Sequence, residues 1–210
     1  MAALSPALSA LLRPGRQYLL RDGFDRADSA SSLGVADAGG AWAVAAGTLG
    51  ISSGRGYFVT DTNGDLATLD AGAGDGLAQV TINGTLVSGT DFRQPQMVVR
   101  YLDANNYLSI RPNDGVTVGL LKTDGGVTSS LASSASVANT FTDGADYVLA
   151  AWMRGQTIQV YVNGTLKITY VLTGGDTKYA GYTRHGVRLR KAGTPATAAR
   201  FEDFSLRRWA

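Results

Sequence analysis

The chain has 210 residues, no cysteine and a net charge of +2. This length suits one large domain, the lack of cysteine excludes disulfides and thiolate metal sites, and the small net charge argues against nucleic-acid binding. Glycine accounts for 27 residues, and long helix-forming runs are missing after the first twenty positions. Such a composition is typical of many short strands joined by tight turns.

The first eighteen residues differ from the rest of the chain. Their apolar positions recur at helical spacing, at Leu4, Leu8, Leu11 and Leu12. Ser5 and Pro6 suit the start of a helix. Because no basic residue precedes the apolar run, a secretory signal is not favoured. We predict an N-terminal arm over residues 1–18 that docks on a partner subunit or on its own domain, residues 19–210.

From Gln17 onward the sequence shows strands and turns only. About fourteen short strands follow one another, from Tyr18–Phe24 to Arg200–Arg207, with glycine, asparagine, aspartate and serine between them. Short strands at this spacing indicate an all-β fold. We expect a two-sheet antiparallel sandwich of the jelly-roll type.

Residues 147–171 predict their own strand pairing. A two-residue turn at Gly155-Gln156 pairs Arg154 with Thr157 and Met153 with Ile158. A two-residue turn at Asn163-Gly164 would set Val160 opposite Lys167, whereas a three-residue loop sets it opposite Leu166 and keeps one face apolar. We therefore predict a three-stranded meander. Its expected core residues are Leu149, Ala151, Met153, Ile158, Val160, Val162, Leu166 and Ile168, and its outer row is Trp152, Gln159 and Lys167.

Several segments resemble, in the expected order, the laminin-G-like domains of the concanavalin A-like lectin/glucanase superfamily. They are the Asp22-Gly-Phe-Asp-Arg-Ala-Asp-Ser opening, Ala41-Trp42, Leu49-Gly-Ile-Ser-Ser-Gly, Tyr101–Tyr107, Gln159-Val-Tyr-Val-Asn-Gly-Thr and Ala199–Phe204. The resemblance covers nearly all of the predicted sandwich. It implies glycan or protein binding as a class, and such domains occur in bacterial secreted proteins and in structural proteins of tailed bacteriophages.

The chain does not show the catalytic pattern of the superfamily's glucanases. Those enzymes carry two glutamates and an aspartate on one strand, which supply the acid and the nucleophile of glycoside cleavage. This chain has a single glutamate, Glu202, and no alternating carboxylate run on a predicted strand. We therefore expect a non-enzymatic protein.

Two further signals favour a structural role. Gly50-Ile-Ser-Ser-Gly54 matches a nucleophile pattern that is meaningful only on a strand-to-helix turn, and no helix follows it. We interpret it as a strand that ends in a turn. The single histidine, His185, lies on a predicted strand, where a packing or surface role is more common than catalysis.

Many domains of the superfamily hold calcium in loops, and the resemblance therefore directs attention to loop oxygens. Asp103, Asn105 and Asn106 offer hard oxygen ligands within one turn, and Asp25 and Asp28 offer more. The competing interpretation is that these side chains only cap the backbone of the turn, which we favour. No other cofactor is expected.

The remaining candidates form a binding face. A tryptophan in mid-strand on an outer face indicates a contact, either with a ligand or with a covering loop or arm. Arginines at alternating positions share one face of a strand and suit an acidic partner or sugar phosphates. The candidate residues for a glycan or partner face are Trp152, Gln159, Lys167, Tyr107, Tyr182, Arg188 and Arg190.

Two functions stay open. The first is a virion structural or assembly protein, a capsid decoration or minor tail component, whose arm binds other virion proteins or further copies of itself as a homo-oligomer. The alternative is a carbohydrate-binding module of a secreted, extracellular bacterial protein, which binds cell-surface or other glycans. The missing catalytic residues and the missing signal pattern favour the first. Neither function calls for nucleic acid or membrane insertion.

Overall fold

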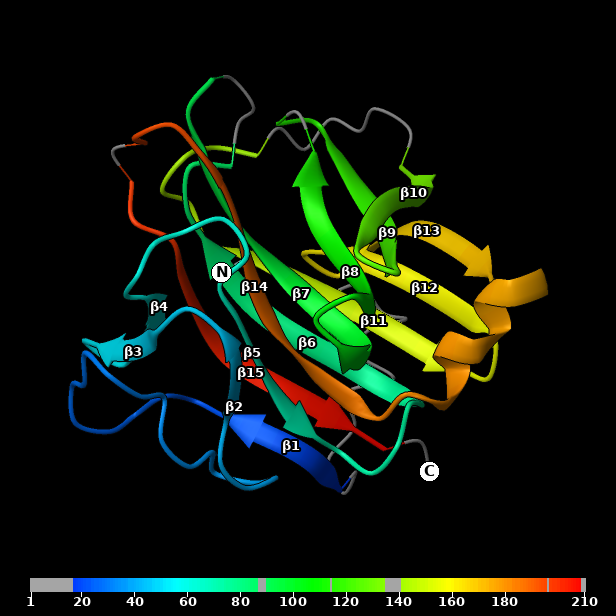
Figure 1. Ribbon diagram of the computed structural model, residues 1–210, viewed down its shortest axis with the longest axis horizontal. Coiled ribbons are helices and arrows are strands. Elements are labelled where there is room, and N and C mark those ends of the chain that lie inside the picture. The colour runs from blue at the N-terminus through cyan, green and yellow to red at the C-terminus, as the bar shows by residue number, and fades with distance from the viewer. Residues whose placement is uncertain (1–16, 87–89, 114, 135–140, 196, 209–210) are drawn as a thin grey trace.

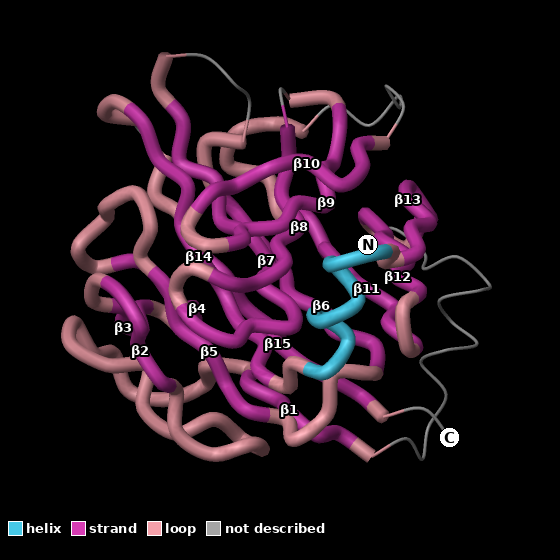
Figure 2. The backbone as a smooth tube through the Cα atoms, turned by 45° about the vertical axis from the view of Figure 1, so that its right-hand side comes forward, coloured by secondary structure: helices cyan, strands magenta, loops and turns pink. Residues whose placement is uncertain are grey.

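The computed structural model describes residues 17–86, 90–113, 115–134, 141–195 and 197–208. Two antiparallel β-sheets are stacked face to face in this part of the chain (Figure 1). Strands and loops make up nearly all of it, with one described 3-10 helix, η1 (Gly174–Gly181) (Figure 2). The predicted all-β antiparallel sandwich is therefore confirmed. No helix within the described ranges has the length and apolar character needed to cross a bilayer.

The back sheet has eight strands. Its path runs β13 (Thr165–Val171), β12 (Thr157–Val162), β11 (Tyr147–Arg154), β6 (Gly76–Asn83), β15 (Arg200–Arg207), β4 (Arg55–Phe58) and β3 (Leu49–Ser52), and β1 (Tyr18–Asp22) also pairs with β15. The front sheet has seven strands. Its order is β10 (Val127–Ser133), β9 (Thr117–Asp124), β8 (Asn106–Asn113), β7 (Phe92–Asp103), β14 (Arg184–Ala192), β5 (Leu66–Asp70) and β2 (Ala43–Ala46).

The core lies between the sheets because alternate residues of each strand point inward. The front sheet contributes Met97, Val99, Leu108, Ile110, Leu120, Val187 and Leu189, and the back sheet contributes Val80, Ile82, Leu149, Met153, Ile158, Val160 and Phe201. All of these are almost completely buried. Their alternate neighbours on each strand therefore form the two outer faces of the sandwich.

A buried carboxylate organises the loop that opens the domain. The side chain of Asp22 has no solvent exposure and accepts hydrogen bonds from the Trp42 indole (2.6 Å) and the Phe24 amide (2.8 Å). Arg26 forms a bidentate pair with the same carboxylate, at 2.7 and 2.8 Å. These bonds satisfy a charge that would otherwise be strongly unfavourable in the interior. They also connect the Asp22 segment to Trp42, which lies 20 residues further along the chain.

The predicted register of the first hairpin is confirmed. Arg154 pairs with Thr157, Met153 with Ile158 and Ala151 with Val160 across the Gly155-Gln156 turn. Of the eight residues predicted to face the core, seven are at most 5% exposed, and the exception is Leu166.

The prediction for the second turn is wrong. Val162 pairs directly with Thr165, so the turn has the two residues Asn163 and Gly164, both with positive φ as a type I′ turn requires. A bulge then shifts the register by one residue, and Val160 pairs with Ile168. As a result Leu166 is 47% exposed on the outer face.

One end of the sandwich is closed by buried polar groups. Arg100 adopts a positive φ of 51° and is fully buried, and its guanidinium donates to the carbonyl oxygens of Gly74 (3.1 Å) and Gly155 (2.6 Å) and to Asp75 (3.0 Å). His185 is also fully buried and bonds to the Ala73 carbonyl oxygen at 3.0 Å. The histidine therefore has the packing role that was expected.

Candidate functional site

The outer face of the front sheet carries a polar group of side chains. Leu108 and Ile110 of β8 point inward, so Tyr107, Ser109 and Arg111 point outward. By the same alternation Arg188 and Arg190 of β14 point outward, since Val187 and Leu189 lie in the core. The two arginines proposed from their alternate spacing thus share the face with Tyr107.

Strand pairing brings these residues together from distant parts of the chain. Arg188 on β14 pairs with Gln96 on β7. Ser109 on β8 lies between Val98 of β7 and Leu121 of β9. Thr123 of β9 pairs with Tyr107 on one side and with Thr128 of β10 on the other. Five neighbouring strands therefore supply one continuous surface.

This surface is hollowed into a recess of about 190 Å³, which we call the front recess. Its described lining consists of Asn63, Gln96, Tyr107, Ser109, Arg111, Leu121, Thr123, Thr128, Arg188 and Arg190. These ten residues include three arginines and no aspartate or glutamate. Their polar groups are mostly hydrogen-bond donors or hydroxyls, which suits a ligand rich in oxygen.

Arg190 is held in place by its neighbours. The centre of its guanidinium lies 4.0 Å from the centroid of the Phe92 ring, and its Nη1 donates to Gln94 Oε1 at 2.8 Å. Gln94 is fully buried and donates in turn to the Leu86 carbonyl oxygen at 2.9 Å. A planar cation stacked on a ring and bonded to a fixed amide loses little further freedom when a ligand binds.

Arg111 is oriented by Asn113, whose side chain fits above Gly119. Its Nε donates to Asn113 Oδ1 at 2.9 Å. The Asn113 side chain occupies the space above Gly119, where a Cβ atom would lie 2.5 Å from the Asn113 Nδ2 atom. Gly119 therefore makes room for the amide that directs Arg111, and a larger residue at position 119 would disturb the recess.

The aromatic part of the front recess is largely closed. Tyr107 is 4% exposed and stacks on Tyr101 at a centroid distance of 6.0 Å. Both pack with Leu66 and Val98 in a small apolar cluster. Burial is the main reason that the pKa of Tyr101 is raised. Tyr107 therefore contributes an edge to the recess rather than an open ring on which a sugar could stack.

The other aromatic candidates lie elsewhere. Trp152 and Gln159 are paired neighbours on the outer face of the back sheet, on the opposite side of the sandwich. Trp152 packs there against Leu77, Ala150 and Tyr161.

Lys167 and Tyr182 also lie outside the front recess. Lys167 falls at the bulge of β13, and Thr169 instead of Lys167 pairs with Gln159. The predicted outer row of Trp152, Gln159 and Lys167 is therefore wrong in its last member. Tyr182 follows η1 and packs edge-on against Tyr179 at 5.5 Å.

The side chains of the proposed calcium ligands form hydrogen bonds within and beside their own turn. Asp103 Oδ1 accepts hydrogen bonds from the Asn105 amide (2.8 Å) and from Asn106 Nδ2 (2.9 Å). The Gly125 amide donates to Asn106 Oδ1 at 3.2 Å. This is the capping arrangement that was favoured over a metal site. No group of three or more His, Cys, Asp or Glu residues that could hold a metal occurs in the described part of the chain.

The predicted docking residues Leu4, Leu8, Leu11 and Leu12 lie outside the described residues.

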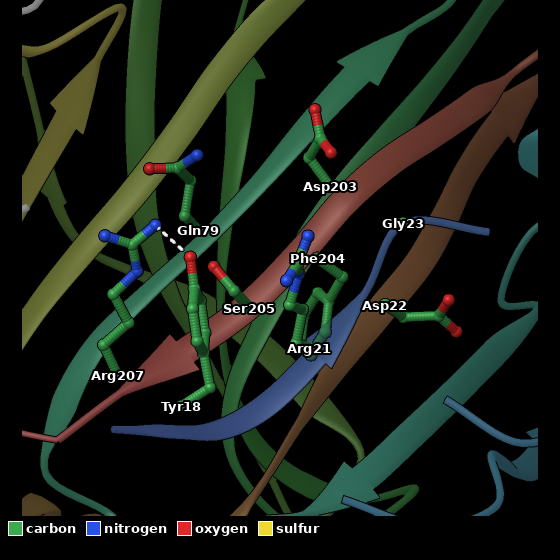
Figure 3. Close-up of a pocket in the computed structure, with 9 residues that line it drawn as sticks. All are labelled: Tyr18, Arg21, Asp22, Gly23, Gln79, Asp203, Phe204, Ser205 and Arg207. Atoms are coloured by element: carbon green, nitrogen blue, oxygen red, sulfur yellow. Dashed lines mark hydrogen bonds between the residues drawn. The ribbon is translucent and has the colours of Figure 1, made fainter. Parts of the chain in front are cut away.

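A second recess of about 140 Å³ lies on the back sheet between β1, β15 and β6 (Figure 3). The ring of Tyr18 stands between the guanidinium groups of Arg21 and Arg207, at 5.4 and 4.5 Å, and its hydroxyl accepts a hydrogen bond from Arg207. Asp22 and Asp203 are part of its lining. Because carboxylates accompany its arginines, this recess differs in charge from the front recess.

Sequence reasoning did not find most of the front recess. Gln96, Ser109 and Arg111 each alternate with core residues, which places them on an outer face. Thr123 and Thr128 have no core residue next to them in the sequence. Alternation cannot say which strands are neighbours, and the strand order was needed to bring these residues together.

No family model matches the chain, and no curated protein matches it. Among solved structures it is similar to the carbohydrate-binding module CBM66 from Bacillus subtilis (17% identity, TM-score 0.57, covering 80% of this chain and 95% of that one). The chain has the concanavalin A-like lectin/glucanase fold.

Two further solved structures share this fold. Domain 4 of AbnA, an extracellular arabinanase from Geobacillus stearothermophilus, in complex with arabinotriose, is 13% identical with a TM-score of 0.57, covering 91% of this chain and 92% of that one. The exoplasmic/lumenal domain of VIP36 in its Ca2+/Man-bound form is 10% identical with a TM-score of 0.52, covering 79% and 82%. At these identities the concanavalin A-like fold is what the proteins have in common.

Proposed function

We propose that the chain is a carbohydrate-binding module without catalytic activity and that it binds its saccharide in the front recess. The observation that carries the proposal is the recess itself, where five adjacent strands supply amides, hydroxyls and guanidinium groups to one hollow. Saccharides are recognised through many hydroxyl groups, and such a surface offers donors and acceptors at strand spacing.

The comparisons support this proposal more than a virion role. The three solved structures described above are a carbohydrate-binding module and two proteins in complex with a sugar, as their descriptions state. The virion interpretation included an arm that docks on a partner, and the structure describes nothing of residues 1–16. We therefore place the extracellular carbohydrate-binding alternative first.

The proposal can be tested with a variant in which a large side chain fills the front recess. Thr128 on β10 and Thr169 on β13 are both exposed threonines on edge strands, but they belong to opposite outer faces. In Thr128→Trp the large ring fills the front recess, and Thr169→Trp is the matched control on the back sheet. We expect Thr128→Trp to weaken binding to a retained polysaccharide about tenfold or more, as loss of several hydrogen bonds implies, and Thr169→Trp to bind like wild type.

Affinity electrophoresis against a panel of neutral and acidic polysaccharides, followed by calorimetry on those that retard the protein, measures this difference. Retardation by none of the polysaccharides would overturn the proposal and return the virion role to first place. Loss of binding in Thr169→Trp alone would move the site to the back sheet.

A further inference from the structure

We infer that the saccharide bound in the front recess is anionic, with a carboxylate or sulfate group held by Arg188 together with Arg111. This inference rests on the proposed function and adds the chemical class of its ligand. It starts from the charge of the recess, which has three arginines and no acidic residue among its ten described lining residues.

Several other buried or half-buried arginines pair with a carboxylate. Arg26 pairs with Asp22, Arg93 with Asp61 and Arg100 with Asp75, at 2.5 to 3.0 Å. Arg188 is half-buried as well, yet its guanidinium forms no hydrogen bond or ion pair with a described residue. A half-buried guanidinium without a counter-charge is a position that an anionic ligand group would complete.

The strand register sets the scale of the site. Arg188 pairs with Gln96 on β7, and Arg111 follows Ile110, the partner of Met97 on the same strand. The two arginines therefore flank Gln96 from the two neighbouring strands, about 10 Å apart at the backbone, which is two strand spacings. Both side chains line the front recess, so one sugar residue bound there can contact both of them.

Arginine suits this task better than lysine would. Its planar fork forms two parallel hydrogen bonds with a carboxylate or sulfate, whereas an ammonium group acts as a point charge. Asn113 fixes Arg111 through Nε, and Phe92 with Gln94 fixes Arg190. Gln96, Ser109 and Asn63 lie between and around the arginines, where they can bond to the hydroxyls of the sugar ring.

Matched pairs of polymers test the inference. Polygalacturonate is compared with its methyl ester, and dextran sulfate with dextran, so that each pair differs only in charge. We expect the charged member of at least one pair to bind about tenfold or more tightly, and its affinity to fall as sodium chloride is raised. The carboxylate and sulfate sources are distinguished by which pair shows the difference.

Variants at Arg188 separate charge from geometry. Arg188→Met is expected to abolish the preference for the charged polymer, and Arg188→Lys to restore only part of it because the fork is lost. The control is Arg154→Met, which removes the same charge from an exposed position at the end of β11. Circular dichroism melting curves establish that all three variants fold.

The outcomes also separate this inference from the proposed function. Equal binding of charged and neutral polymers that Thr128→Trp still abolishes would overturn the anionic ligand and leave the carbohydrate-binding module standing. Equal loss of affinity in Arg154→Met and Arg188→Met would overturn it as well, because binding would then follow net charge alone. Binding of no polymer would overturn both.

Discussion

The two outer faces of the sandwich both carry arginines, but their neighbours differ. On the back sheet Arg55 forms hydrogen bonds with both oxygens of Asp146, at 3.1 and 3.0 Å, and an ion pair with Glu202 at 3.0 Å. The hydrogen bond to Asp146 is the main reason that the pKa of Arg55 is raised, and it lowers the pKa of Asp146. On the front sheet the side chain of Arg188 forms no hydrogen bond or ion pair with a described residue, and the described lining of its recess includes no aspartate or glutamate.

The difference shows how a cation's surroundings indicate its role. A guanidinium that already has its carboxylates joins parts of the fold, as Arg55 joins β4 to β15 and to the segment that precedes β11. A guanidinium such as that of Arg188, which has no described carboxylate partner and lies among amides and hydroxyls in a recess, is available to a ligand from solution. The predictions below test this division.

The largest effect is expected where an arginine–carboxylate pair is most deeply buried. Asp22→Ala leaves Arg26 without its partner and removes the acceptor for the Trp42 indole. Breaking a buried pair in this way costs about 3 to 5 kcal/mol of the free energy of unfolding. Urea denaturation measures it, with the exposed Asp37→Ala as control, which we expect to change stability much less. A similar small loss in both variants would show that the Asp22 network is not needed for the fold.

The burial of His185 makes us expect that the stability of the protein depends on pH. Burial is the main reason that the pKa of His185 falls from 6.5 to about 4, and Arg100 lowers it further, while the Ala73 bond and Asp70 oppose the shift. Between these pH values the unfolded chain takes up a proton that the folded protein does not. Stability due to this group is therefore complete above pH 6.5 and is lost as pH falls toward 4.

Between pH 7 and pH 5 this loss amounts to about 2 kcal/mol. Urea denaturation of wild type and His185→Gln at both pH values measures it, because other titrating groups contribute equally to the two proteins. The variant is expected to show the smaller decrease. Equal decreases would mean that His185 is accessible to protons in the folded state.

The sequence predicted local structure well and long-range structure poorly. The pairing of Met153 with Ile158 follows from one short turn, and it is correct. The next turn was misjudged because an apolar match between Val160 and Leu166 can be made by a longer loop, whereas the protein uses a type I′ turn and a bulge. A bulge restores the parity of a strand without leaving a mark in its hydrophobic pattern.

The predicted binding residues fall on two different sheets because local patterns do not encode strand order. Alternation shows that Trp152 and Arg188 each point out of their own sheet, but it cannot show that the sheets are different. The pairing of Arg188 with Gln96 joins segments about ninety residues apart, and no local pattern encodes it. The signal available for Arg111 was its position beside Ile110 on a predicted strand.

A smaller effect on stability is expected from the back-sheet arginine. Arg55→Met removes contacts with Asp146 and Glu202, but the three side chains are 24 to 43% exposed, and solvent screens their interaction. We expect a loss below about 1 kcal/mol in urea denaturation and no change in polysaccharide binding. Arg188→Met should show the reverse, with unchanged stability and weaker binding. If Arg55→Met weakened binding as much as Arg188→Met, the division between the two faces would fail.

The smallest effect is expected at Glu202, where we predict no change in any catalytic readout. Burial is the main reason that the pKa of Glu202 is raised, which is a property that a general acid would need, and Arg55 opposes the shift. Glycoside cleavage requires a second carboxylate placed across the scissile bond, however, and Asp146 beside it is occupied by a bidentate contact with Arg55. Wild type and Glu202→Gln should both release no reducing sugar from any polysaccharide that the protein binds, in an assay run long enough to detect slow turnover. Sustained release by wild type that disappears in Glu202→Gln would show that the back sheet carries an active site, and the contrast between a structural back face and a binding front face would then have to be reversed.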